Sequence, residues 1–255
     1  MWKFASNSWS SDSGQARLRR REDRATTDGE LAVIGMLIVW TSFVFVVFPQ
    51  LDLAVARLFV HGHVFWLAEN PWLKAARDIA RQSQPYILGT MAVIIVLHVF
   101  LPRRLRFCPP HKPLFVLLSF AAGPLLVVQT LKVAIGRVRP RQLIEFGGTA
   151  DFTPVWQFSA ACSRNCSFPS GEAAAAAAAL SLLVFVPAGR RWIAAVMLVP
   201  CLLFVAFNRV IFGAHFLSDV MLGWLLTMFA MAMIWRRIET NSRLIDRYVT
   251  RLMFR

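Results

Sequence analysis

Six apolar segments separated by polar stretches constrain the fold of this chain more than any other feature of its sequence. A helix needs about 20 mostly apolar residues to cross the hydrocarbon of a bilayer. Segments of this kind lie near residues 31–48, 86–101, 113–134, 171–187, 192–208 and 216–235. With 57% hydrophobic and only 16% charged residues, the chain is too apolar for an ordinary water-soluble domain. We expect an all-α integral membrane protein, a bundle of six transmembrane helices.

The positive charge falls mainly on one side of this alternating topology. The formal net charge is +14, and 28 residues are Lys or Arg. Most of them lie in the N-terminal tail and after the second, fourth and sixth segments. Because basic loops stay in the cytoplasm, we expect a multi-pass protein of the bacterial inner membrane with both termini in the cytoplasm. Basic flanks account for the charge, so the bilayer is the expected partner; nucleic acid is not, and no obligate protein partner is evident.

Three regions are expected along the chain. Residues 1–30 are polar and basic, which is typical of a disordered cytoplasmic tail. No short apolar core with a cleavage site precedes the first span, so we expect this tail to be retained. Residues 31–240 would form the six-span domain, and residues 241–255 a second basic cytoplasmic tail.

An amphipathic helix is expected outside the membrane, between the first two spans. Asn70 and Pro71 have the pattern of an N-cap and a first helical residue. Apolar residues then recur on one face and charged residues lie elsewhere, as in a helix on the periplasmic membrane surface. Such a helix could guide a lipid to a site or only pack at the interface, and the sequence does not separate the two.

Three short clusters at the ends of apolar segments carry the residues that could bind and transfer a phosphate. They span Lys132–Pro140, Pro169–Glu172 and Arg209–Asp219. The topology derived from the basic residues places all three on the external side. We therefore expect one site at the periplasmic surface, acting on a membrane lipid phosphate.

The residue types in these clusters suit particular roles. Lys132, Arg139 and Arg209 would bind the phosphate oxygens, since two planar guanidinium groups and one ammonium match an oxyanion. Ser170 and Gly171, at the start of the fourth span, would add backbone N–H groups of a helix N-terminus.

A histidine and a carboxylate complete the proposed chemistry. His215 and Asp219 are four residues apart, so on a helix they share a face. A neutral imidazole oriented by a carboxylate can act as a nucleophile.

The order and spacing of these clusters resemble those of the type 2 phosphatidic acid phosphatase superfamily. The matching residues are Lys132, then Arg139-Pro140 after six residues, Phe168-Pro169-Ser170-Gly171, and Arg209 followed by His215 and Asp219. The resemblance runs from the third span to the sixth. It implies a lipid phosphatase in which His215 forms a phosphohistidine that water hydrolyses. We expect neither a metal nor a cofactor.

Two positions depart from the family pattern. Asn208 stands where a serine is usual, and can still donate a hydrogen bond. Glu172 stands where the family usually has a histidine that protonates the leaving group. A protonated carboxylic acid can serve the same purpose. Glu172 is therefore either the general acid or the mark of an inactive protein that only binds lipid phosphate.

Other polar residues have less specific interpretations. Cys162 and Cys166 share an external loop and are expected to form a disulfide, with free thiols as the alternative. Arg137 and Arg141 either contact a larger anionic headgroup or are solvated. The remaining histidines, His61, His63, His98 and His111, are expected to be structural.

The headgroup of the substrate is the least determined feature. The external cysteines, the basic surroundings and Glu172 are most similar to the bacterial lipid A phosphatase branch. Undecaprenyl diphosphate, phosphatidylglycerol phosphate and phosphatidic acid remain open, as does phosphate transfer to a second lipid. The soluble haloperoxidases of the superfamily are disfavoured by the apolar spans.

Overall fold

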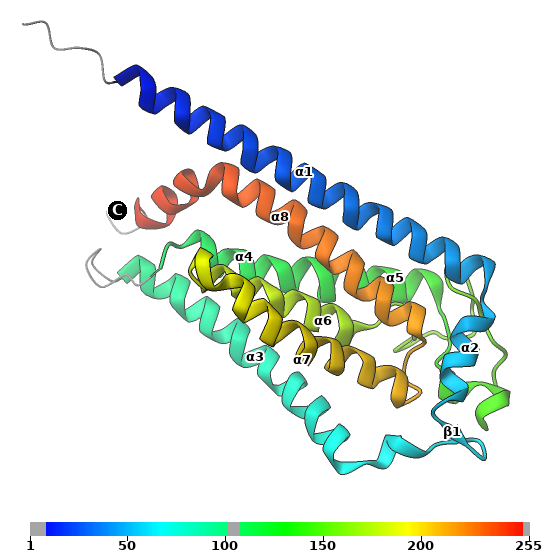
Figure 1. The fold of residues 1–255 in the computed structure, drawn as a ribbon. Helices are drawn as coiled ribbons and strands as arrows, with labels where there is room; N and C mark the ends of the chain where they lie inside the picture. Colours follow the sequence, from blue (N-terminus) through cyan, green and yellow to red (C-terminus); the bar gives the residue numbers. More distant parts are fainter. Residues whose placement is uncertain (1–8, 101–107, 252–255) are drawn as a thin grey trace, which may run out of the picture.

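The structure is a computed structural model that describes residues 9–100 and 108–251 (Figure 1). The basic flanks at residues 1–8, 101–107 and 252–255 lie outside the described residues. The α-helices are α1 (Trp9–Val47), α2 (Gln50–Arg57), α3 (Pro71–Phe100), α4 (His111–Phe120), α5 (Val128–Ile135), α6 (Gly171–Ala179), α7 (Arg191–Ile211) and α8 (Leu217–Arg251). Strands β1 (Val60–His61) and β2 (Val64–Phe65) form a small antiparallel hairpin. A π-helical segment covers Ala121–Val127, and 3-10 turns cover Trp66–Glu69, Pro140–Gln142, Ile144–Phe146, Leu180–Phe185 and Ala188–Arg190.

Five helices in the described part of the chain are long and apolar enough to cross a membrane. They are Asp28–Val47, Pro71–Phe100, His111–Gln142, Ala188–Ile211 and Leu217–Val249. The segment predicted as the fourth span forms a shorter apolar helix, Gly171–Phe185. Its α-helical part tightens into a 3-10 turn before Pro187, which cannot continue a helix. The protein is helical as predicted, with one helix shorter than the prediction.

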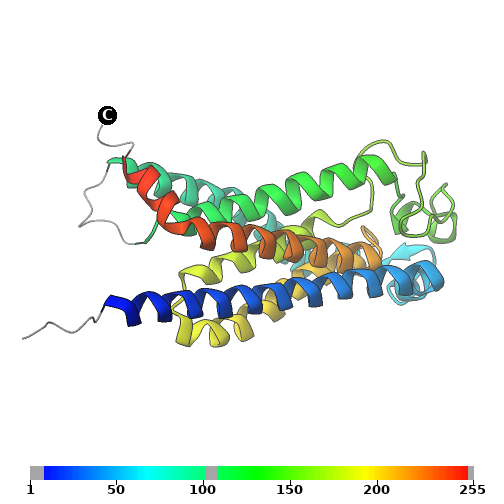
Figure 2. The ribbon, with the colours of Figure 1, turned by 90° about the horizontal axis from the view of Figure 1, so that it is seen from above.

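α6 lies inside the bundle, where it packs against α7 and α8 (Figure 2). The side chains of Ala173–Ala178 are at most 6% exposed. Small side chains let neighbouring helices approach closely, and Gly223 of α8 shows how closely. A Cβ atom on Gly223 would lie 2.8 Å from the carbonyl oxygen of Ser170. The alanine-rich helix is therefore central and tightly packed.

The three predicted clusters lie at one end of the bundle. α1 runs beside α8, and the start of α1 and the end of α8 are both at the opposite end of the bundle (Figure 1). The end of α5, the start of α6, the end of α7 and the start of α8 meet near α2 and the hairpin. The helix arrangement therefore assembles a site from segments that are far apart in the sequence.

α3 corrects the prediction of a surface helix followed by a separate second span. It continues unbroken from Pro71 to Phe100, with Pro85 in its interior. Pro85 removes one backbone hydrogen bond without ending the helix, as membrane helices tolerate. The predicted N-cap is confirmed, because Asn70 Oδ1 accepts hydrogen bonds from the backbone N–H groups of Trp72 (3.0 Å) and Leu73 (3.2 Å).

Both predicted tails are helical where the structure describes them. α1 begins at Trp9, and α8 continues to Arg251, so the boundaries near residues 30 and 240 fall inside helices. Arg residues are frequent in both stretches and favour helix. Ion pairs also bind these helices to the bundle: Asp28 contacts Arg236 at 2.6 Å, and Asp246 contacts His111 at 3.0 Å.

A buried arginine connects α2 to α8 beneath the site. Arg137 is 0% exposed, and its Nη2 donates to Asp52 Oδ2 at 2.8 Å. Its Nη1 donates to Asp219 Oδ1 at 2.6 Å and to Ser218 Oγ at 2.8 Å. The Nε donates to the carbonyl oxygen of Thr153 at 2.7 Å. Arg137 is therefore neither solvated nor a headgroup contact, because two buried carboxylates and a carbonyl occupy its guanidinium group.

Removing the charge of Arg137 should destabilise the protein strongly. In Arg137→Met, Asp52 and Asp219 stay buried without their cation, which costs about 3–5 kcal/mol of unfolding free energy. Unfolding of the detergent-solubilised protein measures this loss. The exposed Arg141, with the same substitution, is the matched control and should change stability by less than about 0.5 kcal/mol. Equal stability of the two variants would contradict the structural role of Arg137.

Candidate active site

A strongly basic pocket of about 550 Å³ lies where the clusters meet. It is lined by six cationic side chains: Arg77, Arg81, Lys132, Arg139, Arg141 and Arg209. Glu172 and Gly171 also line it, so all three predicted clusters contribute to one pocket. A site with several cations and one carboxylate is suited to an anion such as a phosphate.

Lys132 and Arg139 reach this pocket from either side of a tight turn. Lys132 is on the last turn of α5, which ends at Gly136 with a left-handed backbone (φ 62°). A Cβ atom on Gly136 would overlap the carbonyl oxygen of Ser159, so only glycine fits. Arg139 follows on extended backbone and donates to Asn165 from Nε and Nη2. The glycine turn thus lets two cations of one motif face the same pocket.

Ser170 differs from its predicted role in the phosphate cradle. Its Oγ accepts from the backbone N–H of Ala173 at 3.3 Å, which makes it the N-cap of α6. Its own N–H donates to the carbonyl oxygen of Asp219 at 3.0 Å. Neither group is directed to an anion in the pocket. Gly171, the first residue of α6, does line the pocket as predicted.

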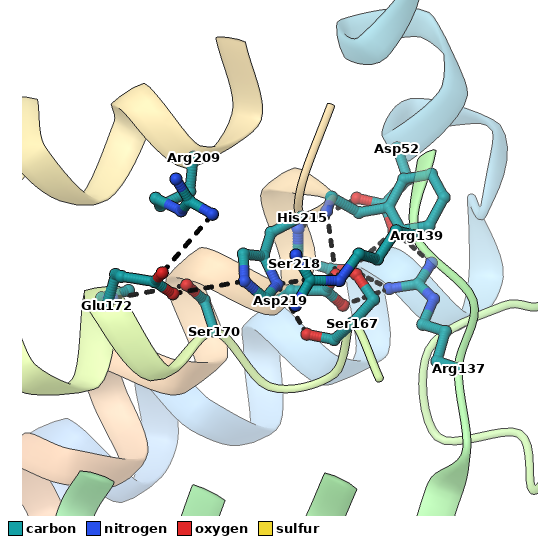
Figure 3. A network of polar contacts seen from close by, with 12 residues as sticks. Asp52, Arg137, Arg139, Ser167, Ser170, Glu172, Arg209, His215, Ser218 and Asp219 are labelled. Atoms are coloured by element: carbon teal, nitrogen blue, oxygen red, sulfur yellow. Dashed lines mark hydrogen bonds and ion pairs between the residues drawn. The ribbon is translucent and has the colours of Figure 1, made fainter. Parts of the chain in front are cut away.

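His215 is fully buried, with one ring nitrogen held by a carbonyl oxygen and the other facing Glu172 (Figure 3). Its Nδ1 lies 2.6 Å from the carbonyl oxygen of Ser167. A carbonyl can only accept, so Nδ1 carries the proton and Nε2 bears the lone pair. Nε2 has no hydrogen-bond partner among the described residues. Burial lowers the pKa of His215, which favours the neutral imidazole that a nucleophile requires.

Asp219 does not hold His215 directly, contrary to the expectation from their spacing. Its Oδ2 is 3.9 Å from His215 Nδ1 and accepts from Ser167 Oγ (2.5 Å) and from the backbone N–H of Phe216 (2.8 Å). Ser167 therefore lies between the two: its hydroxyl donates to Asp219 and its carbonyl accepts from His215. His215 precedes α8, which begins at Leu217, whereas Asp219 lies on the first turn of that helix.

Glu172 lies between the cations and His215 (Figure 3). Its carboxylate pairs with Arg81, lies 3.4 Å from Arg209 Nη2, and lies 3.5 Å from His215 Nε2. Arg209 is 5% exposed, and its Nε has no hydrogen-bond partner among the described residues. The Glu172 carboxylate thus contacts the same cations that an anionic ligand in the pocket would contact.

Four residues of the site were not singled out in the sequence as site residues. Arg81, on α3, faces Glu172 together with Arg77, and their four-residue spacing on one helix was the available signal. Ser167 and Asn165 precede the second motif and act through backbone and side-chain atoms, which no residue pattern reveals. Asn208 does donate a hydrogen bond, but to the carbonyl oxygen of Leu73 in α3 at 2.9 Å.

Cys162 and Cys166 form a disulfide beside the pocket, with their Cα atoms 5.6 Å apart. Cys108 and Cys201 are free thiols. His98 contacts the carbonyl oxygens of Ile94 and Cys108, and therefore has a structural role.

A second cavity of about 570 Å³ opens next to the basic pocket. Both cavities are lined by Arg77, Arg81, Gln84, Glu172 and Arg209. Away from these residues the second cavity is apolar and runs between α3, α6 and α7. Its apolar walls include Ile79, Ile87, Phe120, Ala175 and Phe204. A cationic pocket joined to an apolar cavity is suited to an amphiphile with a phosphate headgroup.

Comparisons with known proteins agree with this geometry. The chain is 33% identical over 226 residues to a lipid A 4'-phosphatase from Rhizobium leguminosarum, covering 81% of this chain and 97% of that protein. It is 41% identical over 121 residues to a lipid A 4'-phosphatase from Rhizobium etli, covering 47% of each. In fold it is similar to the transmembrane PAP2 type phosphatidylglycerolphosphate phosphatase from Bacillus subtilis, with a TM-score of 0.55, 20% identity and coverage of 84% and 98%. Residues 112–243 match the PAP2 superfamily, and the chain belongs to that superfamily.

Proposed function

We propose that this membrane phosphatase hydrolyses a phosphate monoester or diphosphate of a membrane lipid, and that lipid A is the favoured substrate. The observation that carries the proposal is the buried Nε2 of His215, which has no hydrogen-bond partner among the described residues and lies 3.5 Å from Glu172, a residue that lines the basic pocket. The apolar cavity beside the pocket supports a lipid, and the names of the two Rhizobium relatives support lipid A.

Substrate binding would exchange one anion for another. Lys132, Arg139 and Arg209 would bind the phosphate oxygens, and the free Nε of Arg209 offers one more donor. Glu172 contacts Arg81 and Arg209 in the free protein. When a dianionic phosphate takes over these cations, repulsion between the two anions favours protonation of Glu172.

Phosphoryl transfer then needs a nucleophile and an acid. His215 Nε2 attacks phosphorus, a P–N bond forms, and the P–O bond to the lipid breaks. Protonated Glu172 gives its proton to the departing alkoxide. In the second step Glu172 takes a proton from water, the water oxygen attacks phosphorus, and the P–N bond breaks to release phosphate and neutral His215. The lysine and arginines stabilise the charge on the transferring group in both steps.

The groups behind His215 would keep its reactive nitrogen in place. The carbonyl oxygen of Ser167 holds the proton on Nδ1, and Asp219 fixes Ser167 through its hydroxyl. Attack leaves a positive charge on the imidazole ring. Asp219, 3.9 Å from Nδ1, is close enough to stabilise that charge in a buried site.

The expected topology completes the proposal. Six spans in the bacterial inner membrane, with both termini in the cytoplasm, would place the pocket at the periplasmic leaflet, and the distribution of basic residues supports this orientation. The first turns of α3, which carry Arg77 and Arg81, would be the periplasmic amphipathic surface beside the pocket. The reaction as written uses only side chains of this protein and water, without metal or cofactor.

A second candidate follows from Glu172. Its carboxylate already pairs with Arg81 and Arg209, so the chain could hold a lipid phosphate without turnover. Transfer of the phosphoryl group to a second lipid, and hydrolysis of undecaprenyl diphosphate or phosphatidylglycerol phosphate, share the same first step. Turnover and its products separate these candidates.

Phosphate release from purified protein should depend on His215. In detergent, we expect release from lipid A to exceed that from undecaprenyl diphosphate, phosphatidylglycerol phosphate and phosphatidic acid. His215→Ala should reduce it by about 10³-fold or more, because the nucleophile is lost. His61→Ala, on the exposed hairpin, is the matched control and should keep full activity. Full activity of His215→Ala would refute the mechanism, and no release by the wild type would favour the silent binder.

Replacing Glu172 should matter most when the leaving group is poor. For a lipid phosphate, Glu172→Gln should reduce turnover by about 10²-fold, since an amide cannot protonate the alkoxide. For p-nitrophenyl phosphate, Glu172→Gln should reduce the rate of the first step much less, because its leaving group needs no proton. Burst measurements isolate that first step. Glu172→His should retain activity. The carboxylate of Glu145 pairs with Arg57 outside the pocket, so Glu145→Gln is the control for loss of a negative charge. Equal losses with both substrates would argue against an acid role.

A further inference from the structure

We propose that Asn165, held in place by the Cys162–Cys166 disulfide, is a positioning residue for Arg139 and sets the affinity of the pocket for phosphate. The inference rests on the proposed phosphate site, but it concerns a loop outside the three motifs. It also gives the disulfide a role beyond stabilising the fold.

Asn165 holds the guanidinium group of Arg139 with two hydrogen bonds. Arg139 Nε donates to the backbone carbonyl oxygen of Asn165 at 3.0 Å, and Nη2 donates to its side-chain Oδ1 at 2.7 Å. Two bonds from one residue fix both the position and the plane of the guanidinium group. They leave Nη1 for an anion in the pocket, which both residues line.

The backbone of Asn165 must take an unusual conformation to do this. Its φ angle is 58°, in the left-handed region where asparagine is better tolerated than most side chains. The carbonyl and side-chain oxygens then face Arg139 together. A residue that avoids this region would turn the carbonyl away, so both identity and conformation matter at this position.

The loop around Asn165 is anchored at both ends but exposed at its tip. The backbone N–H of Ser159 donates to the carbonyl oxygen of Ile135 at 2.8 Å, and that of Ser167 donates to the carbonyl oxygen of Arg137 at 2.7 Å. Ser163, Arg164 and Asn165 are exposed at the tip. The disulfide closes a short ring around these three residues, and it therefore restricts the part of the loop that carries Asn165.

Breaking the disulfide should free this tip without detaching its anchors. A dithiol transfers two electrons and two protons to the bond, so that two thiols form and the reductant becomes a cyclic disulfide. Cys162 and Cys166 can then separate, and Asn165 can leave the left-handed conformation. Arg139 loses both fixed acceptors, and the pocket should bind phosphate more weakly. A disulfide that only stabilises the fold would lower the unfolding temperature without changing phosphate affinity.

The dissociation constant of inorganic phosphate tests the inference without requiring turnover. It is measured on the intact detergent-solubilised protein, oxidised and after treatment with dithiothreitol. Two substitutions separate the contacts: Asn165→Gly keeps the backbone conformation and carbonyl but removes Oδ1, and Asn165→Ala also disfavours the left-handed backbone. We expect Asn165→Gly to weaken binding about threefold to tenfold, and Asn165→Ala or reduction at least as much.

Matched controls identify the source of each effect. Ser163→Ala, in the same exposed ring, should bind phosphate like the wild type. The double variant Cys162→Ser with Cys166→Ser should bind as weakly as the reduced wild type and should not respond to dithiothreitol, although the free Cys108 and Cys201 remain. Unchanged phosphate affinity in both Asn165 variants, or in the reduced protein, would overturn the inference. Phosphate binding that follows these expectations in a protein without lipid phosphatase activity would uphold the inference and reject the proposed function.

Discussion

The contact between Arg137 and Asp219 is the interaction on which the rest of the site depends. Arg137 is 0% exposed and bridges Asp219 on α8 to Asp52 on α2, with hydrogen bonds of 2.6 and 2.8 Å. Ionised groups are costly to bury unless each is paired, so these three side chains require one another. Asp219 in turn fixes Ser167, whose carbonyl oxygen binds His215. The orientation of the proposed nucleophile thus depends on a buried charge network that never contacts the substrate.

The pocket above this network has the opposite electrostatic character. Six cationic side chains line it, and Glu172 is the one carboxylate among the described residues that line it. A phosphate that enters finds donors already in place, so little reorganisation is needed. In the proposed mechanism the same arrangement couples phosphate binding to the protonation of Glu172, so that substrate recognition supplies the proton for the leaving group. The adjoining apolar cavity lets one molecule occupy both environments.

Local patterns predicted the parts of this protein that depend on neighbouring residues. The apolar segments, the Asn70 cap and the three motifs could be identified because spacing along a helix or turn determines them. Long-range pairing could not be predicted in the same way. Arg137 and Asp52 are 85 positions apart, and Arg81 and Glu172 are 91 apart, so nothing in the local sequence connects them.

Two predictions were wrong, each for its own physical reason. The change from polar to apolar composition within α3 predicts two separate helices. The structure has one continuous helix, because Pro85 does not end it. Direct pairing of His215 with Asp219 was inferred from a four-residue spacing, but His215 precedes the helix that carries Asp219. Ser167, from a distant loop, fills the space between them. A tertiary contact therefore decides how His215 is held.

The most direct test of the account is to trap the phosphorylated protein. The purified enzyme would be mixed with a lipid substrate carrying a radiolabelled phosphate, denatured within one turnover, and digested to locate the label. We predict a phosphoryl group on His215 that is stable in base and labile in acid, and no label in His215→Ala. Turnover of the labelled lipid without any phosphoryl group on His215 would contradict the proposed nucleophile.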